Sequence, residues 1–540
     1  MGYDIADYKA IDPIYGTIED VDNLVSELKK RGMNLMMDLV VNHTSDEHEW
    51  FRQSRSSLTN QKRSWYIWKK PNRDAAGNPL PPNNWSQILG EANSALSEEE
   101  ILTSRYWKWT YDTKTDEYYL SLFTPEQPDL NWENPEVRAA VHDVMTFWLE
   151  RGVCGYRMDV INLISKDQGF PNAEPALGPE FKYHPGSKYY VNGPRMHEYL
   201  QEIKHKVLQK YGAITVGEMP GISDIDEIIR TVGSKSGELN MIFIFDVVEI
   251  DTQPGKVRMT LHEWSVKDLA RAISKWQRAM IEHDGWNSVF LENHDNPRSV
   301  SRYCNDSDAY REYGAKLLAL MQTTLSGTLF VYQGEELGMR NVPKSWDIMK
   351  EYKDIESINF WKKSQELYGN DPKQLAEQRR VLEQKARDHA RSPMQWNAHP
   401  NAGFCEADVE PWMRVNDDYT DVNAEKQQSA ANEEELSTCQ FWQRGLANRK
   451  AHADCFVYGD FRTVGPESDE VFAYLRLGKK SGKWLVVLNF SGKTVEWVIP
   501  EEIKVEGWMA GNYLKGKPEK KLEGAVALRP WEGVLGKCVD

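Results

Sequence analysis

Several apolar segments of this 540-residue chain are followed by the same kinds of polar side chain. The segments are predicted to be β-strands, and a single Asp after a strand is commonly only a turn or helix-capping residue. Carboxylates that follow three separate strands, with Arg and His beside them, indicate a catalytic site instead. The residues concerned are Asp38 with His43, Arg157 with Asp159, Glu218, and His294 with Asp295.

This set of side chains favours carboxylate chemistry. No Ser or Cys nucleophile stands beside a His in the set, and no Gly-rich phosphate loop follows any of the strands. The commonest use of paired carboxyl groups is cleavage of a glycosidic bond. One carboxylate attacks or stabilises the developing cation, and one carboxylic acid protonates the leaving oxygen.

The elements that must position these side chains alternate between helix and strand. Thr17 and Asp20 predict a capping box that begins a first helix, and Gly32 ends it. Strands without polar alternation that follow helices are typical of a parallel sheet covered by helices. Such strands are predicted at 34–42, 153–161, 213–218, 241–247, 288–295 and 327–336, and the helices between them at 135–151, 194–210, 223–232, 266–283 and 309–324.

This rhythm predicts an α/β fold of the (β/α)8 TIM-barrel type, in which the carboxyl ends of all strands lie on one face. Six barrel strands can be counted where eight are needed, so we expect the barrel to lack its first two β/α units. The predicted domains are 1–43, the first part of the catalytic barrel; 44–133, an inserted domain; 134–455, the second part of the barrel with a helical extension; and 456–540, a C-terminal antiparallel β-sandwich.

Composition excludes several classes of protein. The net charge of −16 argues against nucleic acid and anionic membranes as partners. Six scattered cysteines without a C-x-x-C pair argue against zinc and indicate a reducing compartment. No apolar run is long enough for a membrane span or resembles a secretory signal. We therefore expect a cytoplasmic monomer that needs no metal or cofactor and binds a small oligosaccharide.

Five motifs resemble the signature regions of the α-amylase family, glycoside hydrolase family 13. They resemble most closely the branch that contains the oligo-1,6-glucosidases and α-glucosidases, and the resemblance spans the whole chain. "GYDIADY", "RSPMQW" and "LRPWEG" are also similar to that branch. The five motifs are "DLVVNH" (38–43), "QPDLN" (127–131), "GYRMDVIN" (155–162), "VGEM" (216–219) and "FLENHDNPR" (290–298).

The resemblance implies a role for each catalytic residue. Asp159 is expected to be the nucleophile of a retaining α-glucosidase, and Arg157 to keep it ionised by charge attraction. Glu218 is expected to be the acid/base, which must start protonated. Asp295 is expected to bind sugar hydroxyls and stabilise the transition state.

The resemblance also implies residues that contact the terminal glucose. Asp38 is expected to brace its strand rather than to touch sugar. Val160, next to the nucleophile, resembles members that favour α-1,6 bonds, although valine is also an ordinary strand residue. The expected contact residues are Tyr3, Phe123, His43, His294 and Arg391.

The start of the chain differs from the family pattern. Members of the family usually begin with two further β/α units, a calcium-binding loop and an Asp two residues before the Gly of "GYD". Here only Met1 precedes Gly2. We therefore expect the sequence to lack its true N-terminus, and we expect the chain as given to be unstable and nearly inactive.

Four readings of function stay open. The first is a hydrolase of isomaltose-like, maltose-like or sucrose-like substrates. The second is a transglycosylase or a sucrose or trehalose isomerase, because sugar can intercept a retaining intermediate in place of water. The third is a non-enzymatic, transporter-associated subunit, which would carry a membrane helix and lack the catalytic residues. The fourth is an inactive truncated product.

Overall fold

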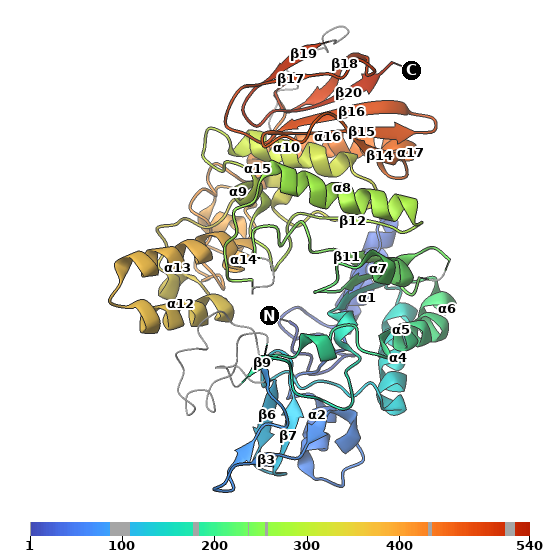
Figure 1. Cartoon of the computed structure of the whole chain (residues 1–540), viewed down its shortest axis with the longest axis vertical. Coiled ribbons are helices and arrows are strands. Elements are labelled where there is room, and N and C mark those ends of the chain that lie inside the picture. Colours follow the sequence, from blue (N-terminus) through green and yellow to red (C-terminus); the bar gives the residue numbers. More distant parts are fainter. Residues whose placement is uncertain are drawn as a thin grey trace. The chain divides into compact units, whose positions relative to one another are not determined.

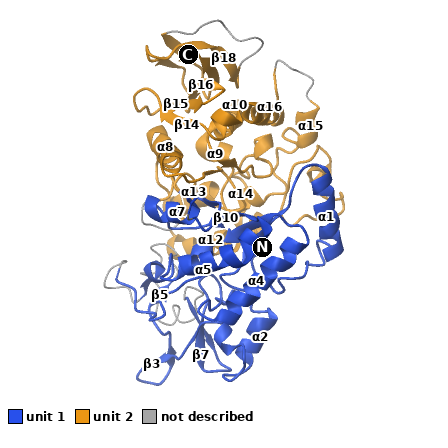
Figure 2. Cartoon of the chain, turned by 90° about the vertical axis from the view of Figure 1, so that its right-hand side faces the viewer, with its two compact units in different colours: residues 1–245 blue, residues 246–540 orange. Residues whose placement is uncertain are grey.

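The computed structural model describes residues 2–86, 108–175, 183–235, 237–253, 258–429, 435–513 and 524–539 (Figure 1). The expectation that the sequence lacks its true N-terminus concerns Met1, which lies outside the described residues. The chain divides into two compact units, 1–245 and 246–540 (Figure 2).

The first unit is built on a four-stranded parallel sheet in the order β1-β8-β10-β11. Val40 pairs with Asp159, and Gly217 pairs with Met158, so the strands end at nearly the same level. This register brings the carboxyl ends of neighbouring strands together, as the sequence predicted. The strands are β1 (Met36–Val40), β8 (Gly155–Asp159), β10 (Ile214–Glu218) and β11 (Met241–Phe243).

Helices alternate with these strands near the predicted positions. The capping box of α1 is confirmed, with Thr17 and Asp20 bonded to each other's backbone N–H groups. In α4, Asn134 caps the helix and Pro135 occupies the first turn, where its missing N–H is harmless. These helices are α1 (Ile18–Lys30), α4 (Pro135–Glu150), α5 (Met196–Ile203) continued by the π-turn η5 (Lys204–Leu208) and α6 (Gln209–Tyr211), and α7 (Ile225–Val232).

The segment inserted after β1 contains more strand than the sequence analysis found. The strand that begins at Glu117 forms the centre of a three-stranded antiparallel sheet, β2-β7-β6. Most of the other strands have only two residues, which is too short for an alternating pattern to be visible. The described elements are α2 (Glu49–Ser56), η1 (Arg63–Trp65), β2 (Trp68–Lys69), β3 (Asn72–Arg73), β4 (Pro79–Leu80), β5 (Trp85–Ser86), β6 (Trp109–Asp112) and β7 (Glu117–Leu120).

Three short elements follow β8, and one of them returns to the inserted segment. β9 (His184–Pro185) pairs in parallel with β5. The other two are the single turns η3 (Ile161–Leu163) and η4 (Ser187–Tyr189).

The second unit carries the last two strands predicted for the barrel. β12 (Ser288–Val289) and β13 (Thr328–Leu329) pair in parallel, but both are much shorter than the predicted strands. Every strand predicted for the barrel is thus present, as one sheet of four and one sheet of two. The number of strands in the barrel stays a prediction.

Helices dominate the rest of the second unit up to residue 456, as expected. They are α8 (Val266–Glu282), α9 (Ser299–Tyr303), α10 (Arg311–Thr324), η6 (Glu335–Leu337), α11 (Ile348–Glu351), α12 (Ile355–Tyr368), α13 (Pro372–Lys385), α14 (Asp388–Arg391), η7 (Pro400–Gly403), α15 (Ala424–Gln428), α16 (Thr438–Ala451) and α17 (Ala453–Phe456). None of the helices among the described residues is long and apolar enough to cross a bilayer.

The C-terminal part forms the expected antiparallel β structure. A five-stranded sheet, β14-β15-β16-β20-β18, accompanies a two-stranded sheet, β17-β19, and a shared cluster that includes Leu485, Trp497 and Leu528 joins them. The other face of the larger sheet packs on α10 through Leu317, Met321 and Val486. The strands are β14 (Asp460–Thr463), β15 (Val471–Gly478), β16 (Gly482–Asn489), β17 (Val495–Val498), β18 (Val505–Gly511), β19 (Ala525–Leu528) and β20 (Gly533–Cys538).

Candidate active site

One guanidinium group organises the carboxyl end of the sheet in the first unit. Arg157 Nη1 donates to Asp159 Oδ1, and Arg157 Nη2 donates to Glu218 Oε2, each at 2.6 Å. All three side chains are at least 87% buried. The strand pattern explains this, because Arg157 and Asp159 lie two residues apart on one face of β8 and Glu218 ends the adjacent strand β10.

Asp159 and Glu218 form a coupled pair that retains a proton. Burial and the neighbouring Glu218 carboxylate raise the pKa of Asp159 to about 8, although Arg157 opposes both effects. Near neutral pH the two carboxyl groups therefore hold one proton between them, and that proton belongs to the pair rather than to either residue. A pair with one ionised and one protonated carboxyl group is what glycosidic cleavage requires.

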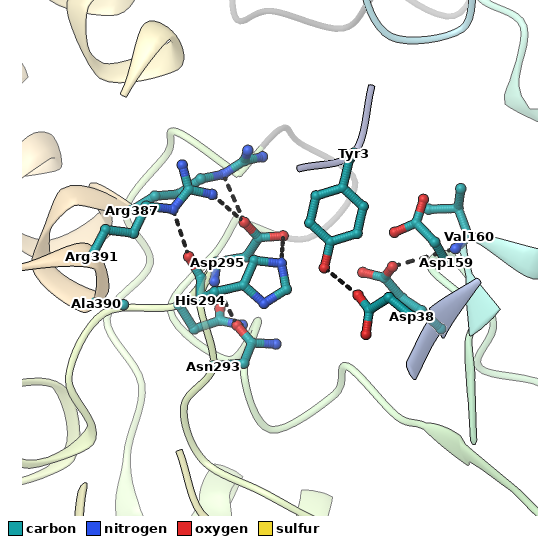
Figure 3. A network of polar contacts seen from close by, with 12 residues as sticks. Tyr3, Asp38, Asp159, Val160, Asn293, His294, Asp295, Arg387, Ala390 and Arg391 are labelled. Carbon is teal, nitrogen blue, oxygen red and sulfur yellow. Dashed lines mark hydrogen bonds and ion pairs between the residues drawn. The ribbon is translucent and has the colours of Figure 1, made fainter. Parts of the chain in front are cut away.

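Asp38 connects the N-terminal loop to the same guanidinium. Its Oδ2 accepts a 2.6 Å hydrogen bond from the Tyr3 hydroxyl, which points at it in Figure 3, and lies 3.5 Å from Arg157 Nη1. The guanidinium also lies 5.5 Å from the centre of the Tyr3 ring. The expected bracing role of Asp38 stays a prediction.

Val160 has an unusual backbone conformation. Its φ of 34° and ψ of 44° lie in the left-handed region, which β-branched residues rarely adopt. In this conformation its N–H donates to Glu218 Oε2 at 3.3 Å. Its side chain is buried in an apolar cluster with Leu163 and Phe170, so its packing role is established and its bearing on linkage stays a prediction.

His43 and Phe123 lie against each other, with ring centres 5.2 Å apart. His43 Nε2 is 3.1 Å from the Tyr3 carbonyl oxygen, so three of the predicted glucose contacts adjoin one another. Burial lowers the pKa of His43, which favours the neutral ring.

A buried polar network adjoins these residues. Lys166 Nζ contacts both Asp129 Oδ1 and Asn42 Oδ1 at 2.8 Å, and all three side chains are buried. Asp129 belongs to the motif "QPDLN", so this motif anchors the loops that carry His43 and Phe123 rather than facing solvent.

The second unit contains a carboxylate surrounded by cations. Arg391 Nη2 donates to Asp295 Oδ1 at 2.7 Å, and Arg387 Nε and His294 Nε2 each lie 3.5 Å from a carboxylate oxygen of Asp295. Both arginines point toward Asp295 in Figure 3. Burial alone would raise the pKa of Asp295, but the cations, with Arg387 first, bring it down to about 2. Asp295 is therefore ionised at neutral pH.

Arg391 makes several contacts at once. Its Nε donates to the His294 carbonyl oxygen at 2.9 Å, and its Nη1 donates to Asp354 Oδ2 at 2.5 Å. The structure thus shows that Arg391 positions Asp295 and the loop around it. The expected contact between Arg391 and glucose stays a prediction.

The sequence analysis missed several members of this cluster. Arg258 Nη2 donates to the Asp295 carbonyl oxygen at 2.5 Å, and its Nη1 donates to Glu356 at 2.8 Å. Arg387 could have been found from its spacing, because two arginines four residues apart share a helix face. No local sequence pattern pointed to Arg258 or Asp354, because they contact the Asp295 loop only through residues that are distant in sequence.

The chain is similar to proteins of a known family. The profile of the alpha-amylase catalytic domain matches residues 1–459. The chain belongs to the α-amylase family. The predicted resemblance is therefore confirmed, and this family member has its family motifs at the strand ends described above.

Relatives of this α-amylase family member include enzymes of known activity. It is 44% identical to an alpha-glucosidase of Schizosaccharomyces pombe and 42% identical to an oligo-1,6-glucosidase of Parageobacillus thermoglucosidasius; each match covers 99% of this chain and 88% of the relative. Among solved structures, isomaltulose synthase from Erwinia rhapontici NX5 has a TM-score of 0.87 at 33% identity, over 100% of this chain and 89% of that one. Trehalose-6-phosphate hydrolase from Bacillus licheniformis has a TM-score of 0.84 at 36% identity, with the same coverage.

Proposed function

We propose that the protein is a retaining α-glucosidase that hydrolyses terminal α-linked glucose from short oligosaccharides of the isomaltose, maltose or sucrose type. The observation that carries the proposal is the shared guanidinium of Arg157, which holds Asp159 and Glu218 side by side with one proton between them. The alpha-glucosidase and oligo-1,6-glucosidase relatives support the same substrate class.

Retention is the outcome expected when the two carboxyl groups lie close together. In retaining glycosidases they lie about 5–5.5 Å apart, whereas inverting enzymes need about 6.5–9.5 Å to admit a water molecule. Asp159 and Glu218 each contact a terminal nitrogen of one guanidinium group, which supports a close approach of their carboxyl groups. Direct attack by Asp159 is therefore the proposed chemistry.

In the first step, an Asp159 carboxylate oxygen attacks the anomeric carbon as the bond to the leaving oxygen breaks. Glu218 gives the proton of the pair to that oxygen, so the aglycone leaves as a neutral alcohol. Arg157 stays bonded to both residues and balances the charge that moves from Asp159 to Glu218. The product is a β-linked glucosyl ester of Asp159.

In the second step, the ionised Glu218 removes a proton from water, and the water oxygen attacks the anomeric carbon. The ester bond to Asp159 breaks, glucose is released in the α configuration, and the proton returns to the pair. A sugar hydroxyl in place of water gives transglycosylation or isomerisation. That alternative is supported by the similarity to isomaltulose synthase.

Asp295 is proposed as the third catalytic carboxylate, which binds sugar hydroxyls and stabilises the positive charge of the transition state. Its fixed ionisation supports this role, because a charge held by arginines needs no reorganisation when the transition state forms. Tyr3, His43, Phe123 and His294 are proposed to contact the glucose.

The proposed architecture is a (β/α) barrel that combines residues 1–43 and 134–455, with the inserted domain 44–133 and a C-terminal β domain at 456–540. A barrel would explain why carboxylates that follow separate strands act on one substrate.

The proposal is tested by the anomeric form of the first glucose released. Hydrolysis of an aryl α-glucoside, which releases a single glucose, is followed by proton NMR at times shorter than mutarotation. The proposal expects α-glucose to appear first. If β-glucose appears first, the mechanism is inverting and the proposal fails; if a glucosyl transfer product accumulates instead of glucose, the alternative activity is favoured.

A further inference from the structure

A pocket of about 620 Å³ lies entirely within the second unit. None of the predicted catalytic or glucose-contacting residues lines it. Its volume falls in the range of about 300–1,000 Å³ that small-molecule sites occupy. We name this cavity the side pocket. Its walls include Asp251, Trp264, Arg302, Arg340, Asn341 and Asp418.

The walls of the side pocket are held by hydrogen bonds that do not need a ligand. Arg340 Nε donates to Asp418 Oδ2 at 2.8 Å, and Asn416, which is 1% exposed, donates to the carbonyl oxygens of Arg340 and Asn341. The Asn341 N–H donates to Ser301 Oγ at 2.9 Å. The pocket is thus preformed, and binding would lose little ordering entropy.

Arg302 fixes one part of this wall. Its side chain is 97% buried, and its Nε and Nη2 donate to the two carboxylate oxygens of Asp251 at 2.8 and 2.5 Å. Its Nη1 is closed to solvent, so a ligand in the pocket does not reach that nitrogen. Arg302 therefore holds Asp251 in place.

The chemistry of the pocket lining favours a neutral ligand rich in hydroxyl groups. The lining contains six carboxylates (Asp251, Glu263, Asp306, Glu383, Asp417 and Asp418) against four cations (Arg302, Arg340, Lys344 and Arg380), which disfavours an anion. Carboxylates accept hydrogen bonds and guanidinium groups donate them, and a sugar hydroxyl can do both. Trp264 adds a half-buried indole, packed on Tyr303 with ring centres 5.8 Å apart. Aromatic rings such as this one pack against the apolar face of a sugar.

We propose that the side pocket is a second saccharide-binding site, which holds one or two sugar rings against Trp264 with hydroxyl groups on lining carboxylates such as Asp306. This goes beyond the proposed hydrolysis, because no residue of the proposed catalytic machinery takes part. Binding there is independent of turnover.

Hydrogen–deuterium exchange of the full chain tests the proposal, with isomaltose as the probe and Asp159→Asn as the background that prevents its hydrolysis. Peptides that cover 260–266 and 299–306 are expected to exchange about fourfold more slowly at three times Kd, because exchange from the bound form is blocked. Trp264→Ala is expected to abolish this slowing, while Trp264→Phe, which keeps an aromatic face, retains most of it.

Two further measurements make the result decisive. Asp306→Ala removes a lining carboxylate with little effect on packing, and it is expected to reduce the slowing if Trp264→Ala does not fold. Peptides around Glu218 report separately on the proposed catalytic site, so failure there is distinguishable. The proposal is overturned if isomaltose leaves the side-pocket peptides unchanged, if the slowing survives both Trp264→Ala and Asp306→Ala, or if inorganic phosphate protects these peptides and isomaltose does not.

Discussion

Asp159 and Glu218 share one guanidinium group, with Arg157 nitrogens 2.6 Å from an oxygen of each. The parallel register of β8 and β10 brings the two carboxylates together, and the alternation along β8 puts Arg157 on the same face as Asp159. The guanidinium group that holds the two side chains also limits the cost of burying the negative charge of the pair.

Arg157→Lys is expected to lower kcat/KM for an aryl α-glucoside by about 10²–10³-fold, because an ammonium group cannot hold two carboxylates in fixed directions. Arg63→Lys is the matched control, since Arg63 is equally buried and pairs with Glu117 at 2.7 Å in the same unit. Activity of the Arg157 variant within twofold of the control would contradict the proposed role of the shared guanidinium.

Asp159→Asn is expected to stabilise the fold more at pH 8 than at pH 5. The raised pKa of Asp159, about 8, describes the proton that it shares with Glu218. The folded state binds this extra proton and loses stability as pH rises from about 4 to 8. Asparagine removes this loss, with an expected gain of about 1–2 kcal/mol at pH 8. Urea unfolding at the two pH values measures it; equal gains at both would show that the Asp159 carboxyl is not strained by burial.

Val160→Thr is expected to lower the isomaltose-to-maltose ratio of kcat/KM by about tenfold, because a hydroxyl replaces a methyl group beside the nucleophile. A stability loss of about 1 kcal/mol is also expected, because the side chain is buried among apolar residues. Val141→Thr, in the buried face of α4, makes the same chemical change away from the site. If the isomaltose-to-maltose ratio of kcat/KM equals that of the control, Val160 does not determine linkage preference.

Arg391→Lys is expected to lower kcat/KM by about 10–100-fold through loss of the ordered Asp295 carboxylate. Lysine can keep only one of the contacts to Asp295, Asp354 and the His294 carbonyl oxygen. Arg379→Lys is a suitable control, because Arg379 also joins several partners within this unit. An Arg391 variant as active as the control would show that Asp295 is positioned without it.

The strand ends could be predicted from the sequence because their apolar runs are long and each is followed by a distinct charged residue. Asp159 and Glu218 are such residues, and their pairing through neighbouring strands follows from barrel topology. The left-handed backbone of Val160 could not be predicted, because β-branched residues avoid that region and only the surrounding packing enforces it. The partners of Asp295 were also hidden, since Arg258 and Asp354 lie 37 and 59 residues away in sequence.

The most direct test of the central claim is to trap the intermediate. A 5-fluoro-α-glucosyl fluoride glycosylates a retaining enzyme faster than the ester is hydrolysed, and mass spectrometry of the digested protein then locates the sugar. The account predicts a single fluoroglucosyl ester on Asp159, in the peptide that also contains Arg157. An ester on Glu218 or Asp295, or no ester while the aryl glucoside is still cleaved, would contradict it.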